Sequence, residues 1–248
     1  MGGAMKGAVA AEWIRLLSSR STWWGLGVSG ALALGVAALA VRVPPGEGEV
    51  TTLVDVVSGA VFGQLVLLVL AVLAMTSEHR SGTVRLAFQA IQGRWQVVAA
   101  KAAVMGAAGG VAGFALGFAA YGFALMLAPS GLDLGLGTVA EWRQVAGVGL
   151  VYAITAVIGV AVGTLVRSSA AAVGGALIWV LVAESAIGLL PRVGDALARW
   201  MPFAMLVSLT DSAKIDVPFG AAGAAVYCIA VAAVLLALAM TLVRSREL

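Results

Sequence analysis

Charged residues are scarce in this chain. Only 11% of its 248 residues are Asp, Glu, Lys or Arg, whereas 62% are hydrophobic and the mean hydropathy is +1.05. A soluble domain carries about 25% charged residues. The chain therefore has too few charges to cover a surface that faces water, which excludes a large soluble protein. The formal net charge is only +3, so nucleic-acid binding is a poor explanation for the pI near 9.4.

Cysteine, histidine and lysine are also rare, and each scarcity argues against a class of function. The single cysteine, Cys228, cannot form an intrachain disulfide bond. The single histidine, His79, lies in a charged stretch without a Cys or His companion, so neither a metal site nor an intramembrane Ser–His protease site is expected. The few lysines follow no G-x-x-x-x-G-K-[ST] loop, so we expect no ATP hydrolysis or other enzyme activity in this chain.

Long hydrophobic runs are what the sequence has in abundance. A membrane-spanning helix needs about 20 mostly apolar residues, and six stretches of the chain qualify. They predict an all-α integral membrane protein with a single transmembrane domain over residues 1–248. The expected spans are residues 23–41, 57–75, 102–127, 145–166, 170–190 and 221–243.

The distribution of charge predicts how these spans are oriented. An even number of spans places both termini on the same side of the membrane. Ten of the fifteen Lys and Arg residues fall on that side, which the positive-inside rule identifies as cytoplasmic. Eight of the twelve acidic residues fall on the other side. We therefore expect a multi-pass protein of the cell membrane with both termini in the cytoplasm.

The segment before the first span has the pattern of a helix that lies on the membrane surface. Trp13, Leu16 and Leu17 recur at helical spacing, while Glu12 and Arg15 are expected to turn towards water. Such a pattern is typical of an interfacial amphipathic helix. The alternative is ordinary anchoring of the first span by flanking Arg and Trp side chains.

The stretch from residue 76 to 101, between the second and third spans, is the most polar part of the chain for a long way in either direction. Thr83 is a suitable helix N-cap and Gly93 is placed to end a helix. Between them, apolar residues recur at i, i+3, i+4 and i+7, which predicts a short helix with one apolar stripe. The stripe consists of Val84, Ala87, Phe88 and Ile91, and Arg85 lies off it. From this pattern alone, the helix either floats on lipid headgroups or docks on a partner.

The beginning of this stretch resembles the E-x-[RK]-x-[GN]-[ST] signature of ABC transporter permeases of the type-2 exporter class. The matching residues are Glu78, Arg80, Gly82 and Thr83, with His79 where a Tyr or Phe is common. Residues 12–24 are similar to the opening phrase of actinobacterial members. Residues 190–191 and 199–202 resemble the family's external segment, so the resemblance extends over nearly the whole chain.

The resemblance implies an architecture and a set of partners. Members of the family have six spans, cytoplasmic termini, an interfacial helix before span one, and a coupling helix between spans two and three. The coupling helix docks on a separate ATP-binding subunit, which would hold ATP and Mg²⁺, so no cofactor is expected in this chain. Two permeases assemble with two ATP-binding subunits, here more readily as a homodimer than a heterodimer. Spans one and five form the interface, which makes Gly174 and Gly175 interface candidates.

Some polar residues and glycines lie inside the expected spans. Glu184 either lines the substrate pathway or is a hydrogen-bonded residue that fixes helix packing, and Gln64 is either a pathway residue or an interhelical hydrogen-bond partner. Most of the G-x-x-x-G pairs are expected to pack helices within one subunit. These pairs are Gly59/Gly63, Gly106/Gly110, Gly113/Gly117 and Gly159/Gly163. The apolar stretch 191–220 is expected to form short helices that cap the outer end of the pathway.

The function that the sequence favours is the membrane-spanning permease subunit of an ATP-driven exporter. The main alternative is a secondary transporter driven by an ion gradient, which normally has several ionisable groups within the bilayer and broken helices. A single Glu within the spans and the absence of a mid-span proline favour the exporter. A scaffold that transports nothing is compatible with the composition.

Overall fold

The structure is a computed structural model that describes residues 2–43, 50–81, 94–130, 132–166, 168–191, 193–211 and 219–245. Within these ranges all the regular structure is helical. Six helical segments there are long and apolar enough to span a membrane, which confirms the number and approximate position of the spans expected from the sequence. They run over Arg20–Arg42, Leu53–Ser77, Trp95–Leu127, Val139–Leu165, Ser169–Gly188 and Gly220–Ser245.

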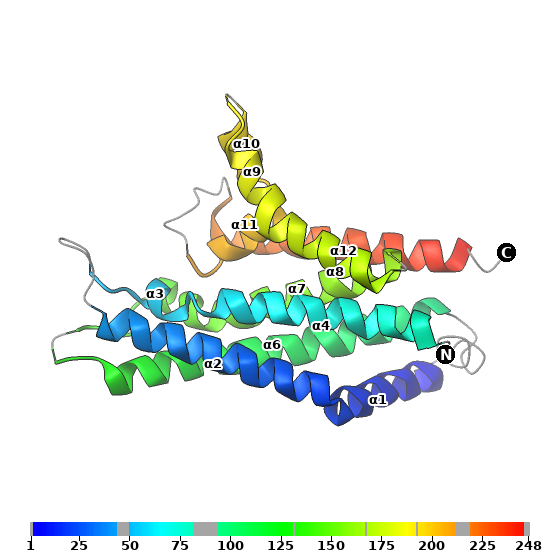
Figure 1. Cartoon of the computed structure of the whole chain (residues 1–248), viewed down its shortest axis with the longest axis horizontal. Helices are drawn as coiled ribbons and strands as arrows, with labels where there is room; N and C mark the ends of the chain where they lie inside the picture. The colour runs from blue at the N-terminus through cyan, green and yellow to red at the C-terminus, as the bar shows by residue number, and fades with distance from the viewer. Residues whose placement is uncertain are drawn as a thin grey trace.

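Five of these segments lie roughly along a common axis (Figure 1). Their long helices are α2 (Arg20–Arg42), α4 (Ala60–Ser81), α6 (Arg94–Leu127), α7 (Val139–Leu165) and α12 (Gly220–Ser245). Both chain termini lie at the same end of the bundle, as an even number of spans requires. We call this the terminal end; α4 finishes and α6 begins there, and α1 (Gly2–Ser18) joins α2 at an elbow.

At the opposite end of the bundle, two helices begin with the same N-capping motif. Thr52 caps α3 (Leu53–Val57), the short helix that leads into α4, and Thr138 caps α7. Each threonine is followed three residues later by an acid, Asp55 or Glu141, whose carboxylate accepts the backbone N–H of the capping residue. This capping box satisfies donors that the first helical turn leaves unpaired, and it places the acids at helix N-termini.

Helix α7 is the centre of the bundle. It packs against α4 on one side and α6 on another, and it is the most buried of the six spans described. Glycines bring these backbones together. A Cβ atom on Gly117 of α6 would lie 2.5 Å from the carbonyl oxygen of Val145, and one on Gly163 of α7 would lie 2.7 Å from that of Val72. Both distances are too short for any side chain, so these helices touch backbone to backbone.

The G-x-x-x-G pairs predicted from the sequence do pack helices within the chain. At each of the eight glycines, an added Cβ would contact another part of the same chain at 3.3 Å or less. Tyr152, which is only 2% exposed, occupies the space that side chains on Gly63 and Gly113 would fill. Its hydroxyl donates a 2.7 Å hydrogen bond to the carbonyl oxygen of Ala60, so the largest buried side chain also ties α7 to the start of α4.

The fifth span departs from the common axis. It consists of α8 (Ser169–Ile178), a π-helical turn η1 (Trp179–Ala183) and α9 (Glu184–Gly188), and Figure 1 shows it slanting away from the other helices. Two short helices, α10 (Gly194–Ala198) and α11 (Pro202–Ser208), follow it. Short helices were expected in this stretch, and they are present; their role as a cap on a pathway stays a prediction.

The close approach of α6 and α7 yields a direct test by glycine substitution. Gly117→Ala should lower the free energy of unfolding by about 1–3 kcal/mol, because the new methyl group overpacks the contact with Val145. Gly122→Ala, on the same helix with nothing within 4 Å of its added Cβ, should leave stability unchanged or slightly raised. Unfolding of both variants in mixed micelles measures the difference. Equal stability of the two would contradict the backbone contact.

Candidate functional site

The segment expected to form the coupling helix falls largely outside the described residues. Helix α4 continues past the predicted end of span two as far as Ser81, and α6 begins at Arg94. Glu78 and Arg80 therefore belong to the last turns of α4. The other residues singled out there lie between the described ranges, and the helix over them stays a prediction: Gly82, Thr83, Val84, Arg85, Ala87, Phe88 and Ile91. The end of α4 and the start of α6, which flank this segment, both lie at the terminal end of the bundle (Figure 1).

The helix expected before the first span is present as α1, but the orientation predicted for Glu12 is wrong. Glu12 does not turn towards water. Its carboxylate accepts a 2.7 Å hydrogen bond and ion pair from the ammonium group of Lys101 on α6. Trp13 and Leu17 are 44% and 45% exposed, so α1 presents its acid to the protein and large apolar side chains outwards. An ion pair with the bundle outweighs the solvation of one carboxylate, and the surrounding bilayer favours apolar groups on the outside.

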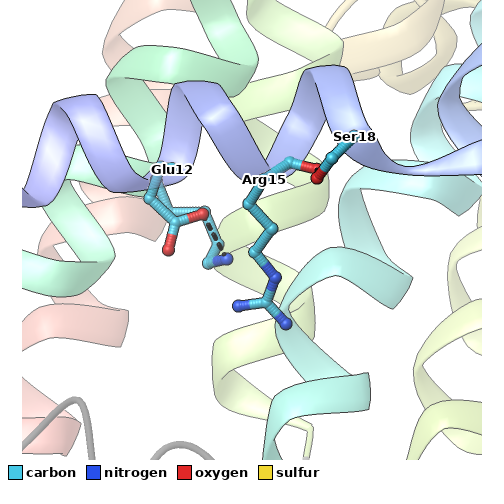
Figure 2. A network of polar contacts seen from close by, with 4 residues as sticks. Glu12, Arg15 and Ser18 are labelled. Carbon is cyan, nitrogen blue, oxygen red and sulfur yellow. Dashed lines mark hydrogen bonds and ion pairs between the residues drawn. The ribbon is translucent and has the colours of Figure 1, made fainter.

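Lys101 directly precedes the third span expected from the sequence (residues 102–127), whereas the structure places it inside a span. Its side chain is 2% exposed and lies within a span that already begins at Trp95. A buried ammonium group requires a partner, because removing an ion from water costs several kcal/mol. Glu12 supplies the partner from 89 residues away in the sequence. Figure 2 shows Glu12 and Arg15 pointing to the same side of α1, with the ion pair as a dashed line.

This ion pair joins two elements that matter for the segment between spans two and three. It fixes α1 to α6 seven residues after the point where α6 begins. About two helical turns therefore separate the ion pair from the end of the segment predicted to form the coupling helix. Any displacement of α6 at this end would be transmitted to α1 through the Glu12–Lys101 contact.

Breaking the ion pair on one side should cost more than removing it altogether. Glu12→Gln deprives the buried ammonium group of this carboxylate, and Lys101→Met removes the ammonium group itself. In a double-mutant cycle of Glu12→Gln and Lys101→Met, we expect a coupling free energy of about 1–3 kcal/mol. Equilibrium unfolding in mixed micelles measures the four proteins. Additive effects of the two substitutions would show that the pair contributes nothing to stability.

The Glu184 carboxylate accepts hydrogen bonds from three donors of its own chain. Its side chain is 9% exposed, and Oε1 accepts hydrogen bonds from Trp179 Nε1 at 3.0 Å and from the backbone N–H of Phe203 at 3.1 Å. Oε2 accepts the backbone N–H of Ala204 at 2.9 Å. The carboxylate thus caps the first turn of α11 from a different helix. The π-helical turn gives Glu184 a second link to Trp179, because its backbone N–H donates to the Trp179 carbonyl oxygen.

The external segment around α11 is held from a second side by the last span. The Tyr227 hydroxyl of α12 donates a 2.7 Å hydrogen bond to the carbonyl oxygen of Trp200, just before α11. The rings of Trp200 and Tyr227 also pack edge to face, with centroids 5.9 Å apart. The Glu184 contacts therefore have the geometry of the packing alternative, a glutamate that locks the segment between spans five and six onto span five.

Replacement of Glu184 separates the packing role from a pathway role. Glu184→Gln should lower stability by about 1–3 kcal/mol, because one oxygen becomes an amino group and a buried backbone N–H loses its acceptor. Ser185→Ala, at the exposed neighbouring position, should change stability little. Thermal unfolding and transport per folded protein are measured side by side. Normal stability with reduced transport in Glu184→Gln would contradict the packing role.

The sequence predicts that Gln64 either lines the pathway or forms a hydrogen bond between helices, and in the structure it forms such a hydrogen bond. Its side-chain Nε2 donates to Thr155 Oγ1 of α7 at 3.0 Å, and both residues are buried. Gln64 also borders a cavity of about 60 Å³, together with Tyr152 and Asp211. Small-molecule sites commonly measure about 300–1,000 Å³, so this cavity is too small for an organic substrate. A pathway role for Gln64 would require the helices to separate.

Gly174 and Gly175 lie on α8 with open space beside them. A Cβ atom on either glycine would meet nothing within 4 Å, unlike the glycines of the G-x-x-x-G pairs. Several large apolar side chains on the following turn are also exposed, among them Ile178, Leu181 and Val182 at 54–61%. Within the single chain, this surface of span five contacts little protein. A lipid tail or a second subunit would cover it in a membrane.

Sequence reasoning missed the residues that organise the interior. Lys101 lies in a run of Val and Ala residues, and that apolar context was the available sign that its charge is buried. Tyr152 is a lone tyrosine in the middle of an apolar span, which signals a hydroxyl in need of an acceptor.

Comparison with the known protein families finds no family model that matches the chain, and no curated protein matches it either.

Proposed function

We propose that this chain is the membrane-spanning permease subunit of an ATP-driven exporter of the ABC type-2 class. The observation that carries the proposal is the position of its signature. The residues Glu78 to Thr83 follow an apolar span directly, and the helix ends on either side of residues 82–93 lie at the same end of the bundle as both termini. A partner on that side of the membrane would meet a segment in that place. This side is the cytoplasm in the proposed orientation.

Other features of the described chain support the same function. Six spans, a helix before the first of them and short helices between the last two follow the order that the family resemblance implies. The exposed apolar surface of span five, with Gly174 and Gly175, fits a second copy of the permease. Interfaces between membrane helices favour small residues of this kind, because they allow close approach. The chain itself would hydrolyse nothing, and ATP and Mg²⁺ would bind to the partner subunit.

The proposed mechanism is alternating access driven from the cytoplasmic side. ATP closes two partner subunits, and their movement reaches the permease through the coupling helix of residues 83–92. Helix α6 continues from that segment into the bundle, where its glycines touch α7. A shift of α6 would therefore be felt by the central helix directly, and by α1 through Lys101 and Glu12. In the proposed mechanism, these contacts would carry the movement of α6 to the helices that form the pathway.

Phe88 is the residue whose replacement tests the docking of the coupling helix. As the largest member of the apolar stripe, its burial would contribute about 2–3 kcal/mol, or about 30- to 150-fold in affinity for the partner. Phe88→Asp should lose more, because it would also place a charge in the contact. We expect the variant to reach the membrane at the normal level, to co-purify poorly with an ATP-binding protein and to lose export.

The control for this experiment is Gln89→Asp, which adds the same charge one position off the stripe. It should retain the partner. Tagged wild type and variants are purified from native membranes at matched expression, and co-purifying proteins that contain a G-x-x-x-x-G-K-[ST] loop are quantified. A helix that only floats on lipid would leave partner binding intact in Phe88→Asp. The wild type itself tests the alternative function. If no ATP-binding protein co-purifies with it and an ionophore abolishes its transport, the chain is a secondary transporter driven by an ion gradient and the proposal of an exporter is wrong.

A further inference from the structure

A cavity of about 340 Å³ lies between the fifth and sixth spans. Its lining comes from α8 and η1 of span five, from α12, from α7 and α4, and from the start of α11. Span five and α12 both pack on α7, but the described residues show no extensive packing between span five and α12. Small-molecule sites in proteins commonly measure about 300–1,000 Å³, so the space between these two spans has the size of a binding site.

The lining of this cavity is apolar. Among the described residues that line it, Trp179 carries the only polar side-chain atom, and its indole N–H already donates to Glu184 at 3.0 Å. The backbone N–H of Phe203, another lining residue, donates to the same carboxylate at 3.1 Å. A buried water molecule needs about two to four polar partners. The cavity therefore favours neither water nor a charged ligand.

The cavity is short in the direction of the spans. Residues four positions apart line it on three elements: Ile158 and Val162 on α7, Gly175 and Trp179 on span five, and Val231 and Leu235 on α12. Four residues of helix rise about 6 Å. Pro202 lies on the side of the opposite end of the bundle, where its carbonyl oxygen accepts the Cys228 thiol at 3.7 Å. An extended lipid chain covers about 15 Å, half of the hydrocarbon core, and would reach well beyond this space.

The volume of the cavity also limits what can fill it. A helix with its side chains is about 10–12 Å wide and rises about 5.4 Å per turn, so a single turn takes about 420 Å³ or more. A helix of a second subunit is therefore too large. An apolar cavity of about 150 Å³ lined by Leu, Ile and Phe binds benzene. The present cavity has a similar lining and about twice that volume, which is enough for two rings.

We propose that this cavity binds a compact, uncharged apolar molecule of about two rings. The aromatic rings of Trp179 and Phe203 line the cavity and would pack against the rings of the ligand. Trp179 is 46% exposed and Gly175 is exposed, so the cavity opens outwards beside span five and the ligand would enter from the bilayer. The inference follows from the lining and the dimensions of the cavity, and it does not depend on the exporter function.

Photolabelling of the purified chain in lipid nanodiscs tests the proposal. The probe is biphenyl that carries a diazirine, and labelled residues are identified by mass spectrometry. We expect labelling of α8, η1 and the middle of α12 to saturate with probe concentration, and unlabelled biphenyl to compete with it. Val111 of α6, which is 71% exposed, serves as the reference for labelling from the bilayer. Labelling of the lining residues that rises without saturation, as at Val111, would overturn the proposal.

A pair of neighbouring glycines provides the first matched variants. A Cβ atom on Gly174 or Gly175 meets nothing within 4 Å, but only Gly175 lines the cavity. Gly175→Phe should fill the cavity and weaken saturable labelling of α12 by about tenfold or more, which corresponds to about 1.4 kcal/mol of lost contacts. Gly174→Phe should leave this labelling unchanged. An equal loss in both variants would show an effect on the surface of span five and would contradict the site.

A second pair of variants repeats the comparison on α12, away from the proposed interface between permeases. Val231 lines the cavity, whereas Val234 on the same helix is 59% exposed. Val231→Phe should weaken saturable labelling of α8, and Val234→Phe should not. Thermal unfolding without the probe verifies that each variant is folded. If Gly175→Phe does not fold, this second pair decides, and unchanged labelling in Val231→Phe would then overturn the site.

Competition between a ring compound and a chain distinguishes the proposed ligand from a lipid tail. Naphthalene and decane have the same number of carbon atoms and differ in shape. At equal concentration in the lipid, naphthalene should displace the probe and decane should do so only weakly. If decane competes as well as naphthalene, the cavity takes the hydrocarbon tail of a lipid and the assignment of a ring compound is wrong.

Discussion

Close contact between backbones is the constraint on which this bundle depends. In a bilayer, burial of apolar side chains gives no net drive for helices to associate, because lipid tails are equally apolar. Association then relies on van der Waals contact and on hydrogen bonds between helices. Helix α7 meets α4 and α6 where Gly117 and Gly163 allow carbonyl oxygens to come within the space of a Cβ atom. Tyr152 fills the space left beside Gly63 and Gly113, so the small residues and the one large residue form a single packed unit.

Polar contacts reinforce this packed centre and also hold elements that lie outside it. Gln64 and Thr155 join α4 to α7 inside the bundle. At the terminal end, Glu12 and Lys101 join α1 to α6. At the far end, Glu184 joins span five to α11. Each of these contacts bridges residues that are 19 or more positions apart in the sequence. Span five has few contacts of this kind apart from Glu184, and it is the span that leaves the common axis.

The spans could be predicted from the sequence because each depends on one local property, the length of an apolar run. The G-x-x-x-G pairs were equally readable, since the spacing itself brings two glycines to one face of a helix. The ion-pair partner of a charged residue could not be predicted from the sequence. Glu12 and Lys101 are 89 residues apart, and the residues around each give no sign of the other. The same holds for Glu184. Its two readings were both compatible with a lone acid in a span, and only the position of α11 supplies the donors that it binds.

For residues 82–93, which lie outside the described ranges, the proposed function rests on the sequence alone. The apolar stripe is a local property, so its residues can be named, but the proposed function places the surface that it meets on another molecule. Helix α6 contacts α7 through its glycines and α1 through the Glu12–Lys101 pair, so in the proposed mechanism a movement of α6 would reach both. If a partner subunit moves the segment that precedes α6, these contacts would pass the movement on to the spans, as the proposed transport mechanism requires.

A photo-crosslinking amino acid at position 88 tests this central claim most directly. It is introduced in place of Phe88 and, in a parallel strain, in place of Gln89, and native membranes are irradiated with and without ATP. The account predicts a crosslink from position 88, and a much weaker one from position 89, to a protein with an ATP-binding P-loop. Crosslinks from position 88 to lipid alone, under both conditions, would contradict it.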